Sequence, residues 1–417
     1  MKILLINHYA GSIYHGMEFR PYYIAREWVK MGHEIVIVAS SFSHLRHKNP
    51  IISGDTQEEI IDGIRYIWIK TPEYHGNDFA RIRNMLSFIR KLYRYLPTIT
   101  KEFVPDAVIA SSTYPVDSYP ARWIAKKHNA KFVFELHDLW PMSPQVLGHM
   151  SKWHPFIMVM QRAEDYWCRN ADVVISLLPD AYKHLVTRGM AMDKYHVVPN
   201  GVDLTEWIGE LEKIPDKHKR FLTQLKKENK FLIAYTGGLV SSNSLHLIID
   251  MADALRDDCS LYFLLVGKGP EQGRLEQKIR ELSLNNISIL PPVPKKAVPA
   301  LFSYMDLFIR ISTGTELEQY GSSPNKIFDY MMSGKPVLWT YSAEDNWIDN
   351  AKCGFTIFKY NLNEICRKIR EIHSMDADAL RRIGLNGREY IIKNLTYPIL
   401  AQKFLDALKG EVQECTK

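Results

Sequence analysis

The chain has no long apolar run. Nowhere in its 417 residues does a stretch approach the roughly 18 consecutive apolar residues that a transmembrane helix needs. The apolar opening Met1–Ile6 is followed at once by Asn7, His8 and Tyr9, so we expect a first strand there rather than a signal peptide. The missing runs argue against a protein that crosses a membrane by helices.

Cysteine is scarce and scattered. The five cysteines show no CxxC or CxxH spacing, so we expect reduced thiols and neither a zinc site nor a disulfide framework. No metal and no cofactor are predicted. The five are Cys168, Cys259, Cys353, Cys366 and Cys415.

The composition is that of a soluble globular protein, with 46% hydrophobic and 24% charged residues. A chain of 417 residues is too long for one core and suits two domains of about 200 residues each. The charge is uneven, because residues 1–200 contain 24 Lys/Arg and 19 Asp/Glu, which is +5 of the net +6. A basic first half suggests an anionic partner such as phosphate, lipid headgroups or nucleic acid.

Apolar runs of strand length alternate with helical periods along the chain. The runs are continuous, which is typical of parallel strands covered on both faces, so we predict two doubly wound α/β domains. Pro199-Asn200-Gly201-Val202-Asp203 is a turn signal, and we place the boundary near residue 203. The predicted strands are Ile3–His8, Ile35–Ala39, Ile64–Ile69, Ala107–Ser111, Phe132–Leu136, Val173–Leu177 and His196–Val198, then Phe231–Tyr235, Tyr262–Val266, Ile287–Leu290, Leu307–Ile311, Pro336–Trp339 and Phe355–Phe358.

The most informative stretch is Gly321–Pro336. It predicts a glycine and serine loop, a helix that opens at Pro324 with a preceding serine as its cap, and a stop at Gly334. The loop amides and the helix N-terminus would point at an anion, with Lys326 one turn inside. Asp329, a turn further on, could accept hydrogen bonds from sugar hydroxyls. An ordinary capped helix between two strands fits the same pattern.

Two strand ends carry further candidates. The strand Phe231–Tyr235 leads into Gly237 and Gly238, where backbone amides can approach a phosphate closely. His137 and Asp138 follow the strand Phe132–Leu136, and polar residues at the carboxyl end of a parallel strand face the ligand cleft.

These motifs resemble those of the family 4 glycosyltransferases, and the resemblance covers nearly the whole chain. Gly321–Pro336 resembles their donor-nucleotide motif, Glu135–Pro141 resembles the place where a histidine contacts the donor sugar, and Val198–Asp203 resembles the segment before their interdomain linker. The resemblance implies the GT-B architecture, two Rossmann-like domains facing each other across a cleft. We expect an acceptor-side domain over residues 1–203, a donor-binding domain over 204–388, and a C-terminal helix at about 389–417 that crosses back onto the first domain.

The resemblance also implies roles for individual residues. His137 and Lys326 would act in transfer, Val293 would lie in the loop that reads the nucleobase, and the glycine loop after the first strand would face the acceptor. The usual Arg and Lys after the Gly237-Gly238 turn are replaced by Ser241–Ser244, so Lys268 and Lys326, and more weakly Arg310, would hold the diphosphate instead. The residue eight before Asp329 is Gly321 rather than an acid. Glu316 and Glu318 lie upstream, and a shifted loop would have to bring either of them to the sugar. The predicted donor-binding residues are Gly237, Gly238, Lys268, Val293, Glu316, Ser322, Ser323, Asn325 and Asp329, and the acceptor-side residues are Gly16, Glu18 and Arg20. For Glu18 and Arg20 a helix cap and a surface charge are the alternative roles.

The function implied is retaining glycosyl transfer from a nucleoside diphosphate donor, which we interpret as UDP-linked, without a protein nucleophile. The chain resembles the N-acetylfucosamine-type transferases of O-antigen and capsule assembly, which implies an N-acetylated amino or deoxyamino sugar and a polyprenyl-diphosphate-linked saccharide acceptor.

The segment Ala80–Lys101 combines an apolar stripe with basic residues and no acid. A basic amphipathic helix suits an anionic membrane surface, so we expect a cytoplasmic protein held peripherally at the inner face of the plasma membrane. A helix packed on its own domain with a solvated basic face fits the pattern equally well. The stripe is Ile82, Met85, Leu86, Ile89, Leu92, Tyr93 and Leu96, and the cations proposed to meet the membrane are Arg81, Arg83, Arg90, Lys91 and Arg94.

Other functions share parts of this pattern. A nucleotide-sugar 2-epimerase of the same architecture, or a transferase with a soluble acceptor, stays open. A nicotinamide dehydrogenase is disfavoured because Gly267-Lys268-Gly269 lacks the third glycine of the GxGxxG pattern. Nucleic acid is not an expected partner, since base-stacking aromatics are not interleaved with the basic residues of the first half.

Overall fold

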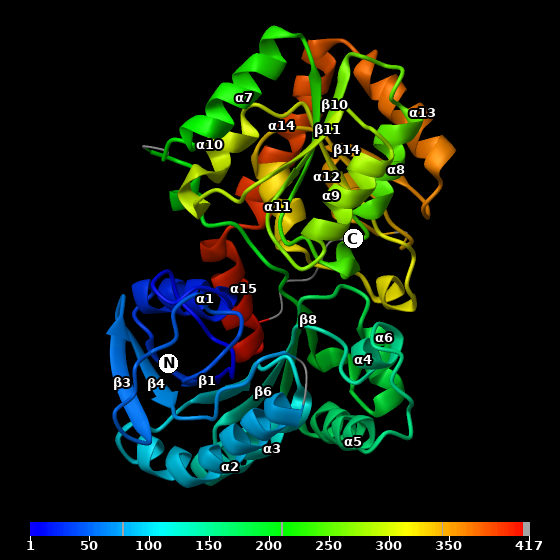
Figure 1. Ribbon diagram of the computed structural model, residues 1–417. Helices are drawn as coiled ribbons and strands as arrows, with labels where there is room; N and C mark the ends of the chain where they lie inside the picture. The colour runs from blue at the N-terminus through cyan, green and yellow to red at the C-terminus, as the bar shows by residue number, and fades with distance from the viewer. Residues whose placement is uncertain (77–78, 210–211, 344, 412–417) are drawn as a thin grey trace. The chain divides into compact units, whose positions relative to one another are not determined.

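The computed structural model describes residues 1–76, 79–209, 212–343 and 345–411. The chain forms two compact units, shown in Figure 1. The first contains the chain up to Asn200 together with the C-terminal segment from Tyr397, and the second runs from Gly201 to Thr396. Cys415 lies outside the described residues, and the other four cysteines are free thiols.

The first unit is built on an eight-stranded sheet in the order β3-β4-β2-β1-β5-β6-β7-β8. Every neighbouring pair is parallel except β3 and β4. The strands are β1 (Lys2–Ile6), β2 (Glu34–Ser40), β3 (Thr56–Ile61), β4 (Ile64–Ile69), β5 (Ala107–Ala110), β6 (Lys131–Leu136), β7 (Val173–Ser176) and β8 (Tyr195–Val197). The helices are α1 (Arg20–Lys30), α2 (Phe79–Glu102), α3 (Ser118–His128), α4 (Met142–Val146), α5 (Pro155–Asn170), α6 (Tyr182–Leu185) and α15 (Tyr397–Lys409).

Strand β3 is the element that the apolar pattern missed. Its sequence TQEEII begins with four polar residues, and three of the six are exposed, because β3 is an edge strand that pairs antiparallel with β4. The predicted strands at the remaining positions of both units are confirmed to within about two residues at each end. The buried strands could be predicted because most of their residues are apolar, and an exposed edge strand has no such requirement.

The C-terminal segment does not form the single helix that we expected from about residue 389. The helix α14 (Ala377–Asn394) ends before Leu395 and Thr396, and α15 begins at Tyr397 in the first unit. There α15 lies against α1 (Figure 1), where Ala401 O accepts a hydrogen bond of 3.0 Å from Trp28 Nε1. The ring of Trp28 packs edge-on against Phe404.

The basic amphipathic helix α2 is present, but much of its apolar stripe packs on its own unit. Met85, Leu92 and Leu96 are buried there, while Leu86 and Tyr93 are exposed. Three of the cations have partners on the same unit. Lys91 and Arg94 form ion pairs of 3.0 Å and 4.0 Å with Asp55, and Arg81 lies over the ring of Tyr9. Across the part of the chain that the structure describes, no helix is both long enough and apolar enough to cross a membrane.

The second unit is built on a six-stranded, wholly parallel sheet in the order β11-β10-β9-β12-β13-β14. The strands are β9 (Phe231–Thr236), β10 (Leu261–Val266), β11 (Ile287–Leu290), β12 (Leu307–Arg310), β13 (Val337–Thr340) and β14 (Gly354–Ile357). The helices are α7 (Asp216–Lys227), α8 (His246–Ala254), α9 (Gln272–Glu281), α10 (Val298–Phe302), α11 (Asn325–Met332), α12 (Trp347–Ala351), α13 (Leu362–His373) and α14. Ile327, Tyr330 and Met331 of α11 are fully buried, so this helix faces the core as predicted.

Candidate active site

A cavity of about 410 Å³ opens in the second unit at the carboxyl ends of β9, β10 and β11. This is where open parallel sheets bind their ligands. Six of the residues predicted from sequence to bind the donor or act in transfer line it together: Gly237, Gly238, Lys268, Val293, Lys326 and Asp329. The other lining residues are Thr236, Val266, Gly267, Pro292, Val298, Leu301 and Phe302.

Two glycines of this cavity, Gly237 and Gly267, have close neighbours. A Cβ at Gly237, whose φ is +138°, would lie 2.0 Å from Cε of Lys326. A Cβ at Gly267 would lie 1.9 Å from the carbonyl oxygen of Gly237. The turn after β9 and the turn after β10 therefore lie against each other, and the side chain of Lys326 packs on Gly237 in the first of them.

The ammonium group of Lys326 is poised to bind an anion. No described residue accepts a hydrogen bond from it, and its nearest aromatic neighbour is Tyr235, whose ring centroid is 5.5 Å from Nζ. Burial and the neighbouring Arg310 lower the pKa of Lys326 to about 8, although Asp329 raises it. A diphosphate would supply the negative charge that this partly desolvated cation lacks.

Asp329 carries the opposite shift. Burial raises the pKa of its carboxyl group to about 7, against the effect of Lys295 and Lys326, which lower it. Lys295 forms an ion pair of 2.7 Å with Glu206, so its charge is shared. Asp329 can therefore accept hydrogen bonds from sugar hydroxyls as a carboxylate above about pH 7.

Arg310 ends β12 beside these groups, and its role is clearer in the structure than in the sequence. Its Nε is buried without a hydrogen-bond partner, and burial lowers the pKa of its guanidinium. The guanidinium carbon lies 5.9 Å from the ring centroid of Trp339. Arg310 does not itself line the cavity, but it is a buried cation with an unsatisfied donor, and its charge acts on Lys326.

The remaining predicted donor residues do not line the cavity. Helix α11 begins at Asn325 with Pro324 as its N-cap residue and without a side-chain cap, so the predicted serine cap is wrong. The carbonyl oxygen of Ser322 accepts a 2.6 Å hydrogen bond from Trp347, and its buried Oγ has no partner. The further residues that lie outside the cavity lining are Ser323, Asn325 and Glu316.

Glu316 begins a short 3-10 turn (Glu316–Tyr320) and is exposed. The turn is held by Glu318, which forms a capping box with Thr315. Glu318 also accepts a hydrogen bond of 3.2 Å from the amide of Ser342. These hydrogen bonds hold the loop through Glu318, and Glu316 does not line the cavity.

In the first unit His137 is held by two side chains. Its Nε2 lies 3.0 Å from Oγ of Ser111 and 3.3 Å from Oε2 of Glu135. Only 10% of its side chain is exposed. No described residue bonds its Nδ1, so this is the ring atom that can meet a substrate.

The charges around His137 favour its protonated form. Burial lowers the pKa of His137, but Glu135, and to a smaller extent Glu18, raise it, and the net shift is upward. Burial in turn raises the pKa of Glu135, while Arg20, His137 and Ser111 together hold it at about 2. Glu135 is therefore a permanent carboxylate that orients the imidazole.

Arg20 is neither a surface charge nor free to contact an acceptor. It is 1% exposed, and its Nε donates to Glu135 at 2.9 Å. Its two terminal nitrogens donate to the carbonyl oxygens of Pro199 and Val198. All of this places Arg20 behind Glu135 as a positioning residue.

The other two acceptor-side residues lie in the loop after β1. Gly16, with φ of +102°, packs against His47, since a Cβ there would lie 2.5 Å from Nδ1 of that residue. Glu18 is partly buried, and its charge acts on His137. Burial raises the pKa of Glu18 although His137 lowers it.

Asp117 is a candidate that sequence reasoning missed. It follows β5, is fully buried, and accepts a 3.0 Å hydrogen bond from the amide of Ser112, while its Oδ1 has no partner. Burial raises its pKa to about 7 against hydrogen bonds from Ser112. The polar residues Ser111–Thr113 after an apolar strand were the available signal, since they mark the carboxyl end of a central strand shortly before Asp117.

Comparison with known proteins identifies the chemistry. Residues 15–201 match the "Glycosyl transferase 4-like domain" family and residues 230–375 match the "Glycosyl transferases group 1" family. Over 137 residues the chain is 27% identical to WcaI of Escherichia coli K12, which is provisionally named a colanic acid biosynthesis glycosyl transferase. That match spans about 33% of this chain and 33% of the relative.

The fold has solved counterparts. The structure of HepE from Anabaena in complex with UDP superposes with a TM-score of 0.67 and 16% identity, covering 98% of this chain and 100% of that one. WaaG, a glycosyltransferase involved in lipopolysaccharide biosynthesis, superposes with a TM-score of 0.64 and 14% identity over 98% and 100% of the two chains. With its two parallel α/β sheets, the chain has the GT-B fold and is a glycosyltransferase of the group 1, family 4 type.

Proposed function

We propose that this glycosyltransferase moves a sugar, with retention of anomeric configuration, from a UDP-linked donor to a lipid-linked saccharide in bacterial surface polysaccharide synthesis. The observation that carries the donor assignment is the cavity in which Lys326 crosses the Gly237 turn with Asp329 one turn further along α11. The amides of the glycine turn and the cations Lys326 and Arg310 complement a diphosphate. Asp329 complements the hydroxyls of a ribose or a sugar.

The relatives support this reading. HepE was solved with UDP and with UDP-glucose, which favours uridine as the base. WcaI is provisionally assigned to colanic acid, and WaaG to lipopolysaccharide, which favours a surface polysaccharide. The proposals of an N-acetylated sugar and of a polyprenyl-diphosphate carrier rest on the resemblance of the sequence motifs.

Transfer by this site needs no protein nucleophile. The leaving diphosphate is stabilised by Lys326, Arg310 and the glycine amides as the bond to the anomeric carbon breaks. The acceptor hydroxyl attacks from the same face, and its proton passes to the departing phosphate. In the first unit, Nδ1 of His137 is available to hold a sugar hydroxyl, and Glu135 keeps the ring oriented.

The domain assignment remains part of the proposal. We assign acceptor binding to the unit that contains His137, and donor binding to the unit that contains the Lys326 cavity. The exposed outer face of α2 would hold the first unit against an anionic membrane, where a lipid-linked acceptor resides. Phe79, Leu86 and Tyr93 are the exposed apolar residues of this face, at 76%, 59% and 40%.

The donor assignment is tested by calorimetry with UDP on the full chain. Lys326→Ala should weaken UDP by about 1.5–3 kcal/mol, the range expected for a hydrogen bond to a charged group. Lys352→Ala, a lysine at the end of α12 outside the cavity lining, serves as the matched control and should leave the affinity unchanged. An unchanged affinity in the Lys326 variant would contradict the assignment. A panel of UDP-sugars, followed by NMR of the product, then gives the sugar and the anomeric outcome.

A further inference from the structure

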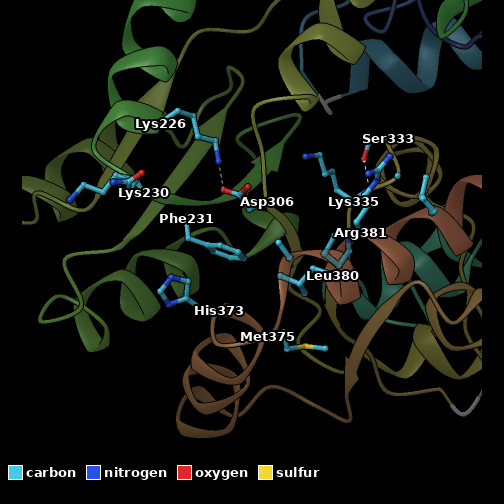
Figure 2. Close-up of a pocket in the computed structure, with 15 residues that line it drawn as sticks. Lys226, Lys230, Phe231, Asp306, Ser333, Lys335, His373, Met375, Leu380 and Arg381 are labelled. Atoms are coloured by element: carbon cyan, nitrogen blue, oxygen red, sulfur yellow. Dashed lines mark hydrogen bonds and ion pairs between the residues drawn. The ribbon is translucent and has the colours of Figure 1, made fainter.

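The second unit has another cavity, larger than the one described above. It has a volume of about 640 Å³, within the range of small-molecule sites. It lies at the amino ends of the central strands, where Phe231 begins β9, Asp306 precedes β12 and Pro336 precedes β13. Figure 2 shows its lining residues, which are Lys226, Asn229, Lys230, Phe231, Asp306, Ser333, Gly334, Lys335, Pro336, His373, Met375, Ala377, Leu380, Arg381 and Leu385.

The cavity is strongly cationic. Its lining contains four Lys or Arg residues and one acid, Asp306. That acid is already used, because it pairs with Lys226 (Figure 2) and accepts a 2.7 Å hydrogen bond from the amide of Leu232. The ammonium of Lys230 donates to the carbonyl oxygen of Cys259.

Two cations of the lining, Lys335 and Arg381, form no ion pair with a residue that the structure describes, although the charge of Asp306 acts on Lys335. Among the described residues, neither the ammonium of Lys335 nor the guanidinium of Arg381 has a hydrogen-bond or ion-pair partner. Lys335 is partly buried, and burial lowers its pKa. A cation that is partly removed from water without a partner is stabilised by an anion that enters the cavity.

The other side of the cavity is apolar. Phe231 and His373 lie edge to face, with ring centroids 5.1 Å apart, and Met375 and Leu380 also line the cavity (Figure 2). This wall would accommodate an aromatic or aliphatic body attached to the anionic group.

The cavity is distinct from the donor site. The donor cavity lies at the carboxyl end of β9, and this strand of six residues is about 20 Å long. The helix α11 has Lys326 in its first turn, and the segment Ser333–Lys335 follows its last turn. The two cavities share no lining residue.

We propose that this cavity is a second ligand site, which binds a phosphate ester with an apolar or aromatic body, its phosphate between Lys335 and Arg381 and its body against Phe231 and Leu380. Two unpaired cations match the charge of a phosphate dianion. The ligand is a different molecule from the sugar donor, and the proposal does not depend on the proposed function.

Phenyl phosphate is a suitable probe, with phenol and inorganic phosphate as partial probes. Binding to the full chain is measured by ligand-observed NMR and calorimetry in the presence of saturating UDP. The wild type should bind phenyl phosphate more tightly than either partial probe. Arg381→Gln should weaken it by about tenfold, and a double variant with Lys335→Gln by more, as expected for lost hydrogen bonds to charged groups.

The matched control is Arg382→Gln, which removes the same charge from the neighbouring, exposed position of α14 outside the cavity lining. It should leave phenyl phosphate affinity unchanged. All variants should keep the UDP affinity and melting temperature of the wild type. Because Arg381 is exposed, its replacement is the least able to disturb the fold.

Three outcomes would overturn the proposal: no binding to wild type, equal binding to Arg381→Gln and the double variant, or displacement by UDP. Cosedimentation with phosphatidylcholine vesicles, with and without phosphatidic acid, identifies the source of the phosphate. If the wild type binds vesicles that contain phosphatidic acid and the double variant does not, the site is assigned to a lipid headgroup. If the wild type binds phenyl phosphate but not these vesicles, the site is assigned to a soluble phosphate ester. A failure of UDP to bind would bear on the donor site alone.

Discussion

Lys326 lies directly above Gly237, so closely that a Cβ on the glycine would come within 2.0 Å of the lysine side chain. The glycine belongs to the turn after β9 and the lysine to the first turn of α11, 89 positions later in the chain. Their contact places a cation over backbone amides that no side chain covers. This arrangement combines a point charge with hydrogen-bond donors, which is what a diphosphate needs.

Gly237→Ala should therefore weaken UDP binding by displacing Lys326, and it should also lower the melting temperature, since φ at this position is +138°. Gly273→Ala is the matched control, because a Cβ there meets nothing within 4 Å and the residue lies inside helix α9. The control should keep UDP affinity and gain about 0.5–1 kcal/mol of stability. Calorimetry and thermal unfolding check both, and equal UDP affinity in the two variants would contradict the role of Gly237.

The affinity for UDP should fall as the pH rises above about 8. The pKa of Lys326 is lowered to about 8, and only its protonated form attracts the diphosphate. At pH 9, one unit above this pKa, about a tenth of the molecules carry a protonated Lys326. The affinity for UDP at pH 9 should therefore be about tenfold lower than in the pH range where Lys326 is fully protonated. At pH 8 binding should take up about half a proton, which calorimetry in buffers of different ionisation enthalpy measures.

Lys326→Arg is the control for this titration. Arginine stays protonated throughout this range, so the variant should lose the decline above pH 8. The same decline in both proteins would assign it to another group. At the lower end, protonation of Asp329 below about pH 7 should reduce the contribution of the sugar hydroxyls to binding.

His137→Ala should keep UDP affinity and lose most of the turnover. The imidazole belongs to the first unit, and its Nδ1 is the ring atom available to a substrate, whereas the UDP cavity belongs to the second unit. A mutation that removed only a substrate contact would lower kcat with little change in the UDP Kd. His246→Ala, at an exposed histidine of α8, is the control and should change neither quantity. Loss of the folded protein in the His137 variant would instead indicate a role in the core.

Membrane attachment through α2 should depend on its exposed cations. Arg83, Arg90 and Arg94 are exposed, and replacing them with Glu should cost about 3 kcal/mol of attraction, at roughly 1 kcal/mol per basic residue. Lys91 is left unchanged because it is the closer of the two cations that pair with Asp55, at 3.0 Å, whereas Arg94 lies 4.0 Å away and is 71% exposed. Cosedimentation with anionic vesicles at low and high salt should show binding by the wild type at low salt only, and none by the triple variant.

A triple variant on α7 is the matched control for charge. Lys217, Lys219 and Arg220 are exposed in the second unit, and their replacement with Glu changes the net charge by the same amount. It should bind vesicles as the wild type does. Equal binding of the wild type to neutral vesicles would contradict the electrostatic account, and a soluble acceptor would then become the better assignment.

The succession of strands along the chain, the two α/β units and six of the residues that line the donor cavity could be predicted from the sequence. Buried strands such as β10 must be apolar throughout, so their runs are visible without a structure. Gly237, Lys326 and Asp329 could be predicted because a glycine turn and a helix opening are local features. The turn and the helix start each depend on a few consecutive residues, so the sequence of that short segment is enough to predict them.

Only the tertiary structure decided which side chains meet. Arg20 and Glu135 lie 115 positions apart, and neither residue type nor spacing reveals that they form a buried pair behind His137. Among the described residues, the buried Nε of Arg310 has no hydrogen-bond partner and Lys335 has no ion pair, and both facts are likewise defined by what surrounds these side chains. The stripe on α2 had two equally good interpretations in sequence, and packing buried Met85 and Leu92 while it left Leu86 exposed. The physical reason is that burial and pairing are set by contacts between distant segments, which the order of residues along one segment does not record.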